Sequence, residues 1–378
     1  MEKKRAVRLP AWAVVMAIAA LCALAYMLAQ GIVSTRELAL STAIPIPALA
    51  EYPMEPLGDG LVFYDGETLH AMDGKGRQIW SHSAGSMASF HVGANTIATW
   101  RGTMLSLIDR RTGELTTSTN VSQSDAGAII EAKPGETYVA TQTEGDAATA
   151  AERQRNTVMY IYDPGARQID RYVIEKQTVI DFGFFRNDQL FWTLGLSTEG
   201  TEPVCLISSY RLGRNMINGF FYDTEQTTYK ALFQSSKIRT IGLKYIKDFD
   251  YRGKEDESSR ILVYGWYMVA LDETGLTPTM LFVPVGQADG MASVTDVRII
   301  ADRQDTALAL PIPAEQVMIK DGVFYGFSSG AVMIREPGEQ IPRTYRLPME
   351  IDRVVGLTDN HSAIVVRGSG VFLIPLRD

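Results

Sequence analysis

Cysteine is scarce in this chain, with two residues among 378. Cys22 lies in an apolar run near the N-terminus and Cys205 stands alone, so the rest of the chain cannot form an internal disulfide. The 32 glycines follow no triplet period, and amphipathic helix patterns longer than two turns are missing after residue 60. These absences exclude disulfide-stapled and collagen-like scaffolds. The 46% hydrophobic content excludes a disordered polymer, which leaves a globular protein.

One long apolar run stands near the N-terminus. Residues 11–29 (AWAVVMAIAALCALAYMLA) carry no charge, and a helix of that length spans about 28 Å, which matches a bilayer core. Lys3, Lys4, Arg5 and Arg8 precede the run. By the positive-inside rule we predict a cytoplasmic N-terminus at residues 1–10, a transmembrane helix at 11–33 and an extracytoplasmic remainder. The protein is thus expected at the cell membrane as a single-pass protein.

A cleaved signal peptide is the alternative, but its apolar region usually has about 7 to 15 residues, so an uncleaved anchor is favoured. The charge divides with the predicted topology. Residues 1–33 have four Lys and Arg against one Glu, or +3, and residues 34–378 have 32 against 43, or -11. An acidic exterior does not favour nucleic acid or anionic lipid. The predicted partners are the bilayer, through residues 11–33, and an envelope protein or cell-wall component, with no nucleic acid.

A strand-and-turn pattern repeats along the remainder. Residues 60–80 (GLVFYDGETLHAMDGKGRQIW) alternate β-rich runs with turns at Asp65-Gly66 and Asp73-Gly74, and 36 residues later Gly102 and Asp109 repeat them. More divergent copies are marked by Asp163 and Gly165, by Gly265, Asp272 and Gly275, by Gly330 and Gly338, and by Gly368 and Gly370.

Small sheets of this kind must pack against one another, and radial packing gives a propeller. We predict an all-β fold: a β-propeller of about seven four-stranded blades, with six or eight as alternatives, preceded by one transmembrane helix. The last copy stops after its third strand. We predict that residues 38–49 (LALSTAIPIPAL) supply the fourth and close the ring, within a linker at 34–58 before the propeller at 59–378.

The block Val62 to Trp80 resembles the repeat of PQQ-like, quinoprotein-type propellers, in which a D-G turn, a strand ending in Asp, a G-x turn and a terminal Trp recur. The whole chain also resembles a family of single-pass, surface-facing propeller proteins of Gram-positive bacteria. Resemblance to a quinoprotein dehydrogenase would imply bound PQQ, a Ca²⁺ ion, a catalytic Asp and often adjacent cysteines. This chain has no adjacent cysteines, so we expect no cofactor.

No residue set identifies a reaction, so we predict no catalytic, cofactor-binding or metal site. Asp65, Asp73, Asp109, Asp163 and Asp272 fall in turns, where capping explains them. His70, His82, His91 and His361 form no i,i+4 pair. Asp73, Gly76 and Trp80 miss the spacing of a sialidase Asp box. Asp248, Asp250 and Gly253 resemble a calcium loop, but Arg252 and Ser259 occupy ligand positions. Nucleotide-binding and nucleophile-elbow motifs are missing.

Three apparent insertions remain as binding candidates: residues 143–156, 247–258 and about 286–313. The sequence therefore favours a membrane-anchored, extracytoplasmic propeller that serves as a protein-interaction or ligand-sensing scaffold at the cell envelope without catalysis. The alternative is a cell-wall polysaccharide hydrolase or lyase. Paired carboxylates about 5 to 9.5 Å apart at the central channel would favour that alternative.

Overall fold

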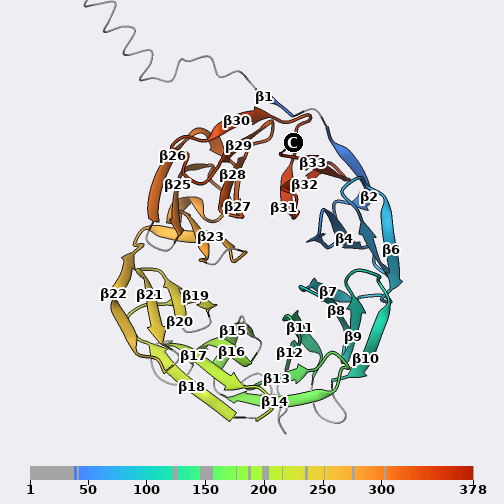
Figure 1. The fold of residues 1–378 in the computed structure, drawn as a ribbon, viewed down its shortest axis with the longest axis vertical. Helices are drawn as coiled ribbons and strands as arrows, with labels where there is room; N and C mark the ends of the chain where they lie inside the picture. Colours follow the sequence, from blue (N-terminus) through green and yellow to red (C-terminus); the bar gives the residue numbers. More distant parts are fainter. Residues whose placement is uncertain are drawn as a thin grey trace, which may run out of the picture.

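The computed structural model describes residues 38–377 except 41, 122–126, 145–155, 176, 186–188, 198–203, 215, 235–236, 251, 275–276 and 302–303. These residues form eight sheets arranged in a ring around a central axis (Figure 1). Each sheet is one blade of a β-propeller, and its first strand lies nearest the axis. The predicted all-β propeller is confirmed, and the blade number is eight instead of seven.

Blades 1 to 4 contain β3 (Met54–Leu57), β4 (Gly60–Tyr64), β5 (Thr68–Met72), β6 (Gln78–Ser83); β7 (Ser89–Val92), β8 (Thr96–Arg101), β9 (Met104–Asp109), β10 (Leu115–Asn120); β11 (Ile129–Pro134), β12 (Val139–Glu144), β13 (Asn156–Tyr162), β14 (Gln168–Glu175); and β15 (Gln177–Phe184), β16 (Leu190–Ser197), β17 (Val204–Arg211), β18 (Met216–Asp223).

Blades 5 to 8 contain β19 (Thr228–Phe233), β20 (Lys237–Gly242), β21 (Tyr245–Asp250), β22 (Glu255–Leu262); β23 (Trp266–Asp272), β24 (Thr279–Pro284), β25 (Val294–Ala301), β26 (Gln304–Ala314); β27 (Gln316–Lys320), β28 (Val323–Phe327), β29 (Ala331–Arg335), β30 (Arg343–Arg346); and β31 (Arg353–Leu357), β32 (Ser362–Arg367), β33 (Gly370–Pro375) with β2 (Ile44–Leu49). A short strand, β1 (Leu38–Ala39), and a single-turn 3₁₀ helix (Val285–Gln287) complete the described elements.

Packing between blades explains which strands are apolar throughout. The second strand of a blade is covered on both faces by its neighbours, so every residue of β4 is buried. An outer strand such as β10 has no fully buried residue. The hydrophobic clusters lie between neighbouring blades; for example, Trp192 of blade 4 stacks on Phe233 of blade 5 with ring centroids 4.1 Å apart. Blades therefore shield one another's apolar faces.

One tryptophan docks onto the next blade in the way the repeat suggests. The indole N–H of Trp80 in β6 donates a hydrogen bond to the carbonyl of Arg110 in blade 2 at 3.3 Å. Its ring covers Gly113, which has φ +72°, and a Cβ there would lie 2.5 Å from the ring. Glycine is thus required at this position both for the turn and for the close approach.

The N-terminal segment joins the two ends of the ring. β2 pairs antiparallel with β33 and forms the outermost strand of blade 8, with Ile44 opposite Leu373. This is the role proposed for residues 38–49. β1 adds to the outer edge of blade 7, parallel to β30, with Leu38 opposite Tyr345. The chain then enters blade 1 through β3, so the first blade begins at Met54, ahead of the predicted start at 59.

Two of the three predicted insertions are parts of blades 5 and 6, which is why the predicted blade number is too low. Residues 247–258 contain most of β21 and the start of β22 in blade 5, and residues 286–313 contain β25 and most of β26 in blade 6. In blade 5, Asp250 and Gly253 repeat the turn of Asp73 and Gly76, so the segment predicted as an insertion does carry the repeat. In blade 6, the residues between β25 and β26 include no glycine, and the repeat is not readable there. Asp272 was also assigned to the wrong turn. It ends the first strand of blade 6, and Gly265 lies between blades 5 and 6.

The ring has two faces. Face I carries the connections between the first and second and between the third and fourth strands of each blade. Face II carries the connections between the second and third strands and between successive blades. Among the described residues, no helix is long and apolar enough to cross a bilayer. Residues 1–10 and the predicted span at 11–33 lie outside the described part of the chain.

Candidate binding site in the central channel

First strands from five consecutive blades bring charged side chains to the central channel. They are Glu55 of β3, His91 of β7, Lys133 of β11, Asp181 of β15 and Lys230 of β19. Each strand starts at face II and runs toward face I, so similar positions along different strands reach a similar depth. A cluster therefore forms from residues that are about 40 to 50 positions apart in the chain.

Asp181 is the centre of this cluster. Its two carboxylate oxygens accept hydrogen bonds from Lys133 Nζ at 2.6 Å and from Lys230 Nζ at 2.5 Å, and its side chain is 10% exposed. Burial acts to raise the pKa of Asp181, but the charges and hydrogen bonds of Lys230 and Lys133 outweigh it and lower that pKa. This lysine-carboxylate-lysine bridge fixes blades 3, 4 and 5 to one another at the channel.

Lys133 has further contacts. Its Nζ lies 3.3 Å from Glu131 Oε1 and 4.7 Å from the centroid of the Phe182 ring. A second ion pair joins blades 1 and 2, where Glu55 Oε1 lies 3.1 Å from His91 Nδ1 and Glu55 Oε2 accepts the backbone N–H of Val92. The hydrogen bond from Glu55 raises the pKa of His91 against the opposing effect of burial.

Five of the first strands also carry a β-bulge at matching positions. The unpaired residues are Ile130, Ile180, Tyr229, Val269 and Val355. Ile130, Ile180 and Val269 are 53%, 43% and 38% exposed, which is unusual for apolar residues on the innermost strands. A bulge leaves one residue unpaired and changes the direction of its side chain. The channel strands therefore carry exposed apolar side chains beside the ion pairs.

A cavity of ≈ 510 Å³ opens beside the Asp181 cluster on face I. It is formed by the ends of first strands and the connections that follow them in blades 2 to 6. Its lining combines charged, aromatic and glycine residues, among them His91, Lys133, Glu136, Phe184, Phe233 and Glu273. A concave site with aromatic walls and a few polar groups is typical of a ligand-binding pocket.

The chemistry of this site favours binding. A general acid in a glycosidase needs a carboxyl group whose pKa is raised, and Asp181 is shifted in the opposite direction by two ammonium groups. Both of its oxygens are already occupied. The described residues contain no group of three or more His, Cys, Asp or Glu side chains arranged to hold a metal ion. The site presents fixed charges and aromatic surfaces.

The turn aspartates act as the sequence indicated. Asp73 Oδ1 accepts the backbone N–H groups of Lys75 and Arg77, and Asp163 Oδ1 accepts those of Gly165 and Arg167. The remaining members of the group behave similarly: Asp65 accepts from Glu67 and Thr68, Asp109 from Arg111 and Thr112, and Asp272 from Thr274 and from Gly322 of the next blade.

The calcium-loop candidate is a connection in blade 5. Asp248 forms a two-oxygen ion pair with Arg239, at 2.7 and 2.9 Å, and its side chain is 4% exposed. Asp250 caps its own turn through the N–H groups of Arg252 and Lys254. The spacing that suggested calcium therefore reflects two different structural roles.

The four histidines are distributed around the ring. His91 lies in the channel, His70 bonds Asp65 at 2.8 Å, and His82 lies on the outermost strand of blade 1. His361 is 9% exposed and lies between Tyr325 and Arg377. The insertion candidate at 143–156 connects β12 to β13 on face II, and its residues 145–155 lie outside the described part.

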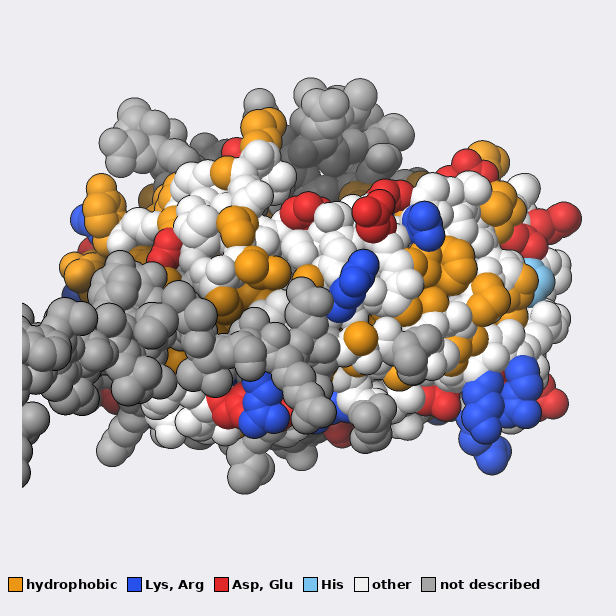
Figure 2. All heavy atoms as spheres, turned by 90° about the horizontal axis from the view of Figure 1, so that it is seen from above, with side chains coloured by type: hydrophobic (Ala, Val, Ile, Leu, Met, Phe, Trp, Pro, Cys, Tyr) orange, Lys and Arg blue, Asp and Glu red, His pale blue; other side chains and the backbone are white. Residues whose placement is uncertain are grey.

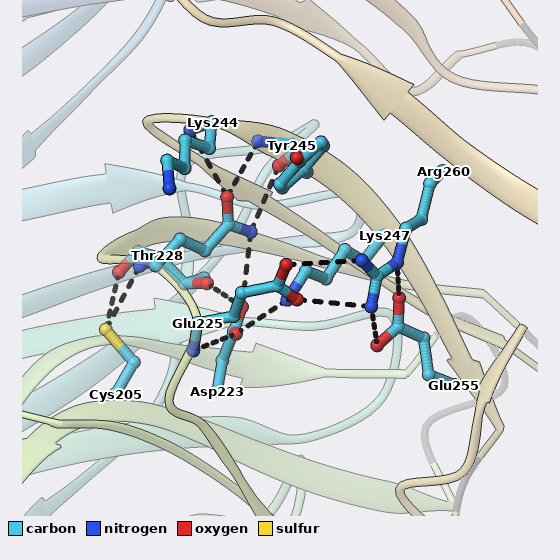
Figure 3. A network of polar contacts seen from close by, with 10 residues as sticks. Cys205, Asp223, Glu225, Thr228, Lys244, Tyr245, Lys247, Glu255 and Arg260 are labelled. Carbon is cyan, nitrogen blue, oxygen red and sulfur yellow. Dashed lines mark hydrogen bonds and ion pairs between the residues drawn. The ribbon is translucent and has the colours of Figure 1, made fainter. Parts of the chain in front are cut away.

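A second polar network lies between blades 4 and 5 (Figure 3). Lys247 is 2% exposed and donates to Asp223 at 3.0 Å and to Glu225 at 2.8 Å, while Arg260 joins Glu225 to Glu255. Burial opposes a charge on Lys247, but both carboxylates outweigh it and raise the pKa. Cys205 is buried nearby and bonds the backbone of Thr228. This network joins blade 4 to blade 5, and we call it the Lys247 clamp.

Sequence reasoning missed Glu55, Lys133, Asp181 and Lys230. They belong to four different blades, and their proximity depends on how the ring closes. One signal was present: Asp181 stands in the otherwise uncharged strand QTVIDFGF. A charge inside a buried strand requires a partner, and that partner lay about 50 residues away in either direction.

No protein-family model matches the sequence, and no curated protein matches it either. Solved structures do match in fold. The C-terminal WD40 domain of Sif2 gives a TM-score of 0.58 at 12% identity, covering 89% of this chain and 99% of that one. The computationally designed protein Ika8 gives 0.55 at 13% identity, with coverage of 89% and 99%.

A quinohemoprotein alcohol dehydrogenase, ADHIIG of Pseudomonas putida HK5, gives a TM-score of 0.53 at 9% identity and covers 90% of this chain and 77% of that one. At sequence identities of 9 to 13%, similarity to these structures is evidence for the fold alone. It confirms the β-propeller fold, and the PQQ-like type stays a prediction. The resemblance to a membrane-anchored family stays a prediction.

Proposed function

We propose that this protein is a non-catalytic interaction or ligand-sensing scaffold, anchored in the cell membrane by residues 11–33, with the propeller outside the cytoplasm. The central cavity beside Asp181 is its binding site. The partner is an envelope protein or cell-wall component that inserts a segment into the cavity. The observation that carries the binding role is the bridge from Lys133 through Asp181 to Lys230.

This bridge supports binding for two reasons. It holds three blades in one geometry, so the cavity walls are preorganised and a ligand need not order them. It also pairs the most buried carboxylate of the cluster with two ammonium groups, so Asp181 itself is not suited to act as the general acid in hydrolysis of a glycan. A WD40 domain and other propellers share this rigid ring, and binding on such scaffolds usually resides on loops and channel mouths.

Site-specific photo-crosslinking in intact cells tests this function. A photo-reactive amino acid placed at Phe184, in the cavity wall, should give a discrete crosslinked product. The same amino acid at Ile79, which is 52% exposed on the outermost strand of blade 1, is the matched control. The Phe184 product should disappear when Lys133→Glu is added. Equal products from both positions, or a product indifferent to Lys133→Glu, would contradict a cavity ligand.

Carboxylate substitutions address the hydrolase alternative. Glu136 and Glu273 line the cavity, so Glu136→Gln and Glu273→Gln would abolish any glycan cleavage that depends on them. We expect the wild-type protein to release no soluble fragments from isolated cell walls. If the wild-type protein released soluble fragments and either variant did not, the protein would be an enzyme and the scaffold proposal would be wrong.

A further inference from the structure

The connections of the two faces differ in charge: those of face II are mainly acidic, and those of face I carry both acidic and basic residues. On face II the connections are acidic, and Lys244 is the one cation among their described residues. Glu225 of this set is shared with the Lys247 clamp. The acidic residues are Glu51, Asp65, Glu67, Glu225, Asp289, Glu315, Glu350 and Asp352. An acidic surface of this kind is repelled by an anionic membrane.

Face I differs at its periphery. Each connection between the third and fourth strands lies at the outer edge of the ring, and those of blades 1 to 5 carry exposed cations. We call five of them the cationic arc: Lys75, Arg111, Arg214, Arg252 and Lys254. The capping aspartates of these turns, such as Asp73, face their own backbone N–H groups. The basic side chains of these turns are exposed.

The side view shows part of this difference. In Figure 2 the largest groups of Lys and Arg side chains project along the lower edge of the visible part of the ring, with Asp and Glu side chains beside them, and charged side chains along the upper edge are mainly acidic. The exterior part of the chain has a net charge of -11. The basic character is thus local to one rim, and it acts over about 8 Å at physiological salt.

The direction of the N-terminal strand adds an independent observation. Fourth strands run from face I to face II, because each begins at a face I connection. β1 is parallel to β30, a fourth strand, so the chain enters Leu38 from the face I side. Leu38 pairs with Tyr345, the third of the four residues of β30, so β1 lies along the half of β30 that is nearer to face II. Residues 34–37 would bridge about 17 Å at full extension between the proposed anchor and Leu38.

We infer that face I is turned toward the membrane, with the cationic arc against anionic lipid headgroups and face II directed away. This inference rests on the proposed anchor at residues 11–33. The charge of each face and the direction of β1 point to the same orientation. The central cavity opens on face I, so its occupant reaches it from the space between the ring and the bilayer.

Depth-dependent fluorescence tests the orientation with the full chain reconstituted in vesicles. Single cysteines are introduced as Pro164→Cys in a face I connection of blade 3 and as Thr224→Cys in a face II connection of blade 4; both positions are exposed. Cys22→Ser removes the N-terminal thiol, and Cys205 is 1% exposed. Each introduced cysteine carries a fluorophore, and the vesicles contain a quencher attached to lipid headgroups.

The label at residue 164 should be quenched about twofold more than the label at residue 224 in phosphatidylcholine vesicles with about 30% phosphatidylglycerol. The difference should shrink in phosphatidylcholine alone and at high salt. Combining Arg111→Glu, Arg214→Glu and Lys254→Glu should remove the dependence on anionic lipid. The control Lys244→Glu on face II should leave it unchanged, and unaltered melting temperatures would show that the variants fold.

Two outcomes would overturn the inference in distinguishable ways. Equal quenching of both labels, or stronger quenching at residue 224, in a chain that resists alkaline extraction would refute the orientation and leave the anchor intact. Release of the chain by alkaline carbonate would refute the anchor and the orientation together.

Discussion

The hydroxyl of Tyr325 lies 2.7 Å from Nδ1 of His361, which joins β28 of blade 7 to the first turn of blade 8. On the opposite side of the His361 imidazole, Arg377 Nη1 lies 3.1 Å from Nε2. Arginine can only donate, so Nε2 accepts and Nδ1 carries the proton that it donates to Tyr325. His361 is therefore neutral at this interface. Asp321 lies 3.3 Å from Nε2, and Glu336 and Lys320 also act on the ring.

We predict that acid weakens the contact between blades 7 and 8. Burial, and then the charge of Arg377, lower the pKa of His361. A histidine with a lowered folded-state pKa binds more protons when unfolded, so its stabilising contribution is complete above about pH 6.5 and falls as the pH drops below it. Urea unfolding between pH 5 and 7.5 should show a smaller pH slope in His361→Asn. Asparagine tolerates the φ of +58° found at this residue. An unchanged slope would contradict the assignment.

His91 should titrate in the opposite sense. Its hydrogen bond to Glu55 raises its pKa, so its stabilising contribution is complete below about pH 6.5 and is lost as the pH rises through the higher folded-state value. NMR titration should place His91 above and His361 below the usual histidine range. Glu55→Gln should lower the pKa of His91 and leave that of His361 unchanged. A pKa of His91 that does not respond to Glu55→Gln would refute the pairing.

Loss of the ion pairs of Lys247 should lower the unfolding free energy by a large amount. Lys247→Ala would leave the Asp223 carboxylate, which is 1% exposed, without its cation. Breaking a buried ion pair on one side typically costs about 3 to 5 kcal/mol of unfolding free energy. The double variant Lys247→Met and Asp223→Leu should recover most of that loss, because it buries no charge. Lys244→Ala, three residues away and exposed, is the control and should change stability by about 0.5 kcal/mol or less. Equal stabilities for Lys247→Ala and Lys244→Ala in urea unfolding would show that the clamp contributes nothing.

Ring closure by β2 makes a separate prediction. Ile46 is 5% exposed and packs in the cluster between blades 8 and 1, whereas Leu49 on the same strand is 41% exposed. Ile46→Ala should lower the unfolding free energy by about 2 to 5 kcal/mol, and Leu49→Ala by a small fraction of that. Deleting residues 38–49 while keeping residues 1–37 should lower the melting temperature by many degrees, because the edge of β33 is then unpaired. Calorimetry of the three variants would check this, and an unchanged melting temperature in the deletion would refute the closure.

The sequence alone determined the all-β class, the radial packing of repeated small sheets and the turn role of the capping aspartates. These features are local: alternating apolar residues, Gly at positive φ and Asp before a tight turn act over a few residues, and each leaves a readable pattern. The closing segment at 38–49 was also visible, because the last copy lacked a fourth strand. The blade count was wrong because the Asp250 and Gly253 turn of blade 5 was interpreted as part of an insertion that resembles a calcium loop, and blade 6 has no such turn signal.

The tertiary structure decided where charges meet. Asp181 and its two lysines come from three blades and meet because the ring brings first strands to one axis, a relation that no local pattern encodes. The uneven distribution of cations between the two faces is likewise invisible along the chain, since connections to face I and face II alternate every few residues. Local chemistry fixed the blades, and the closure of the ring fixed the site.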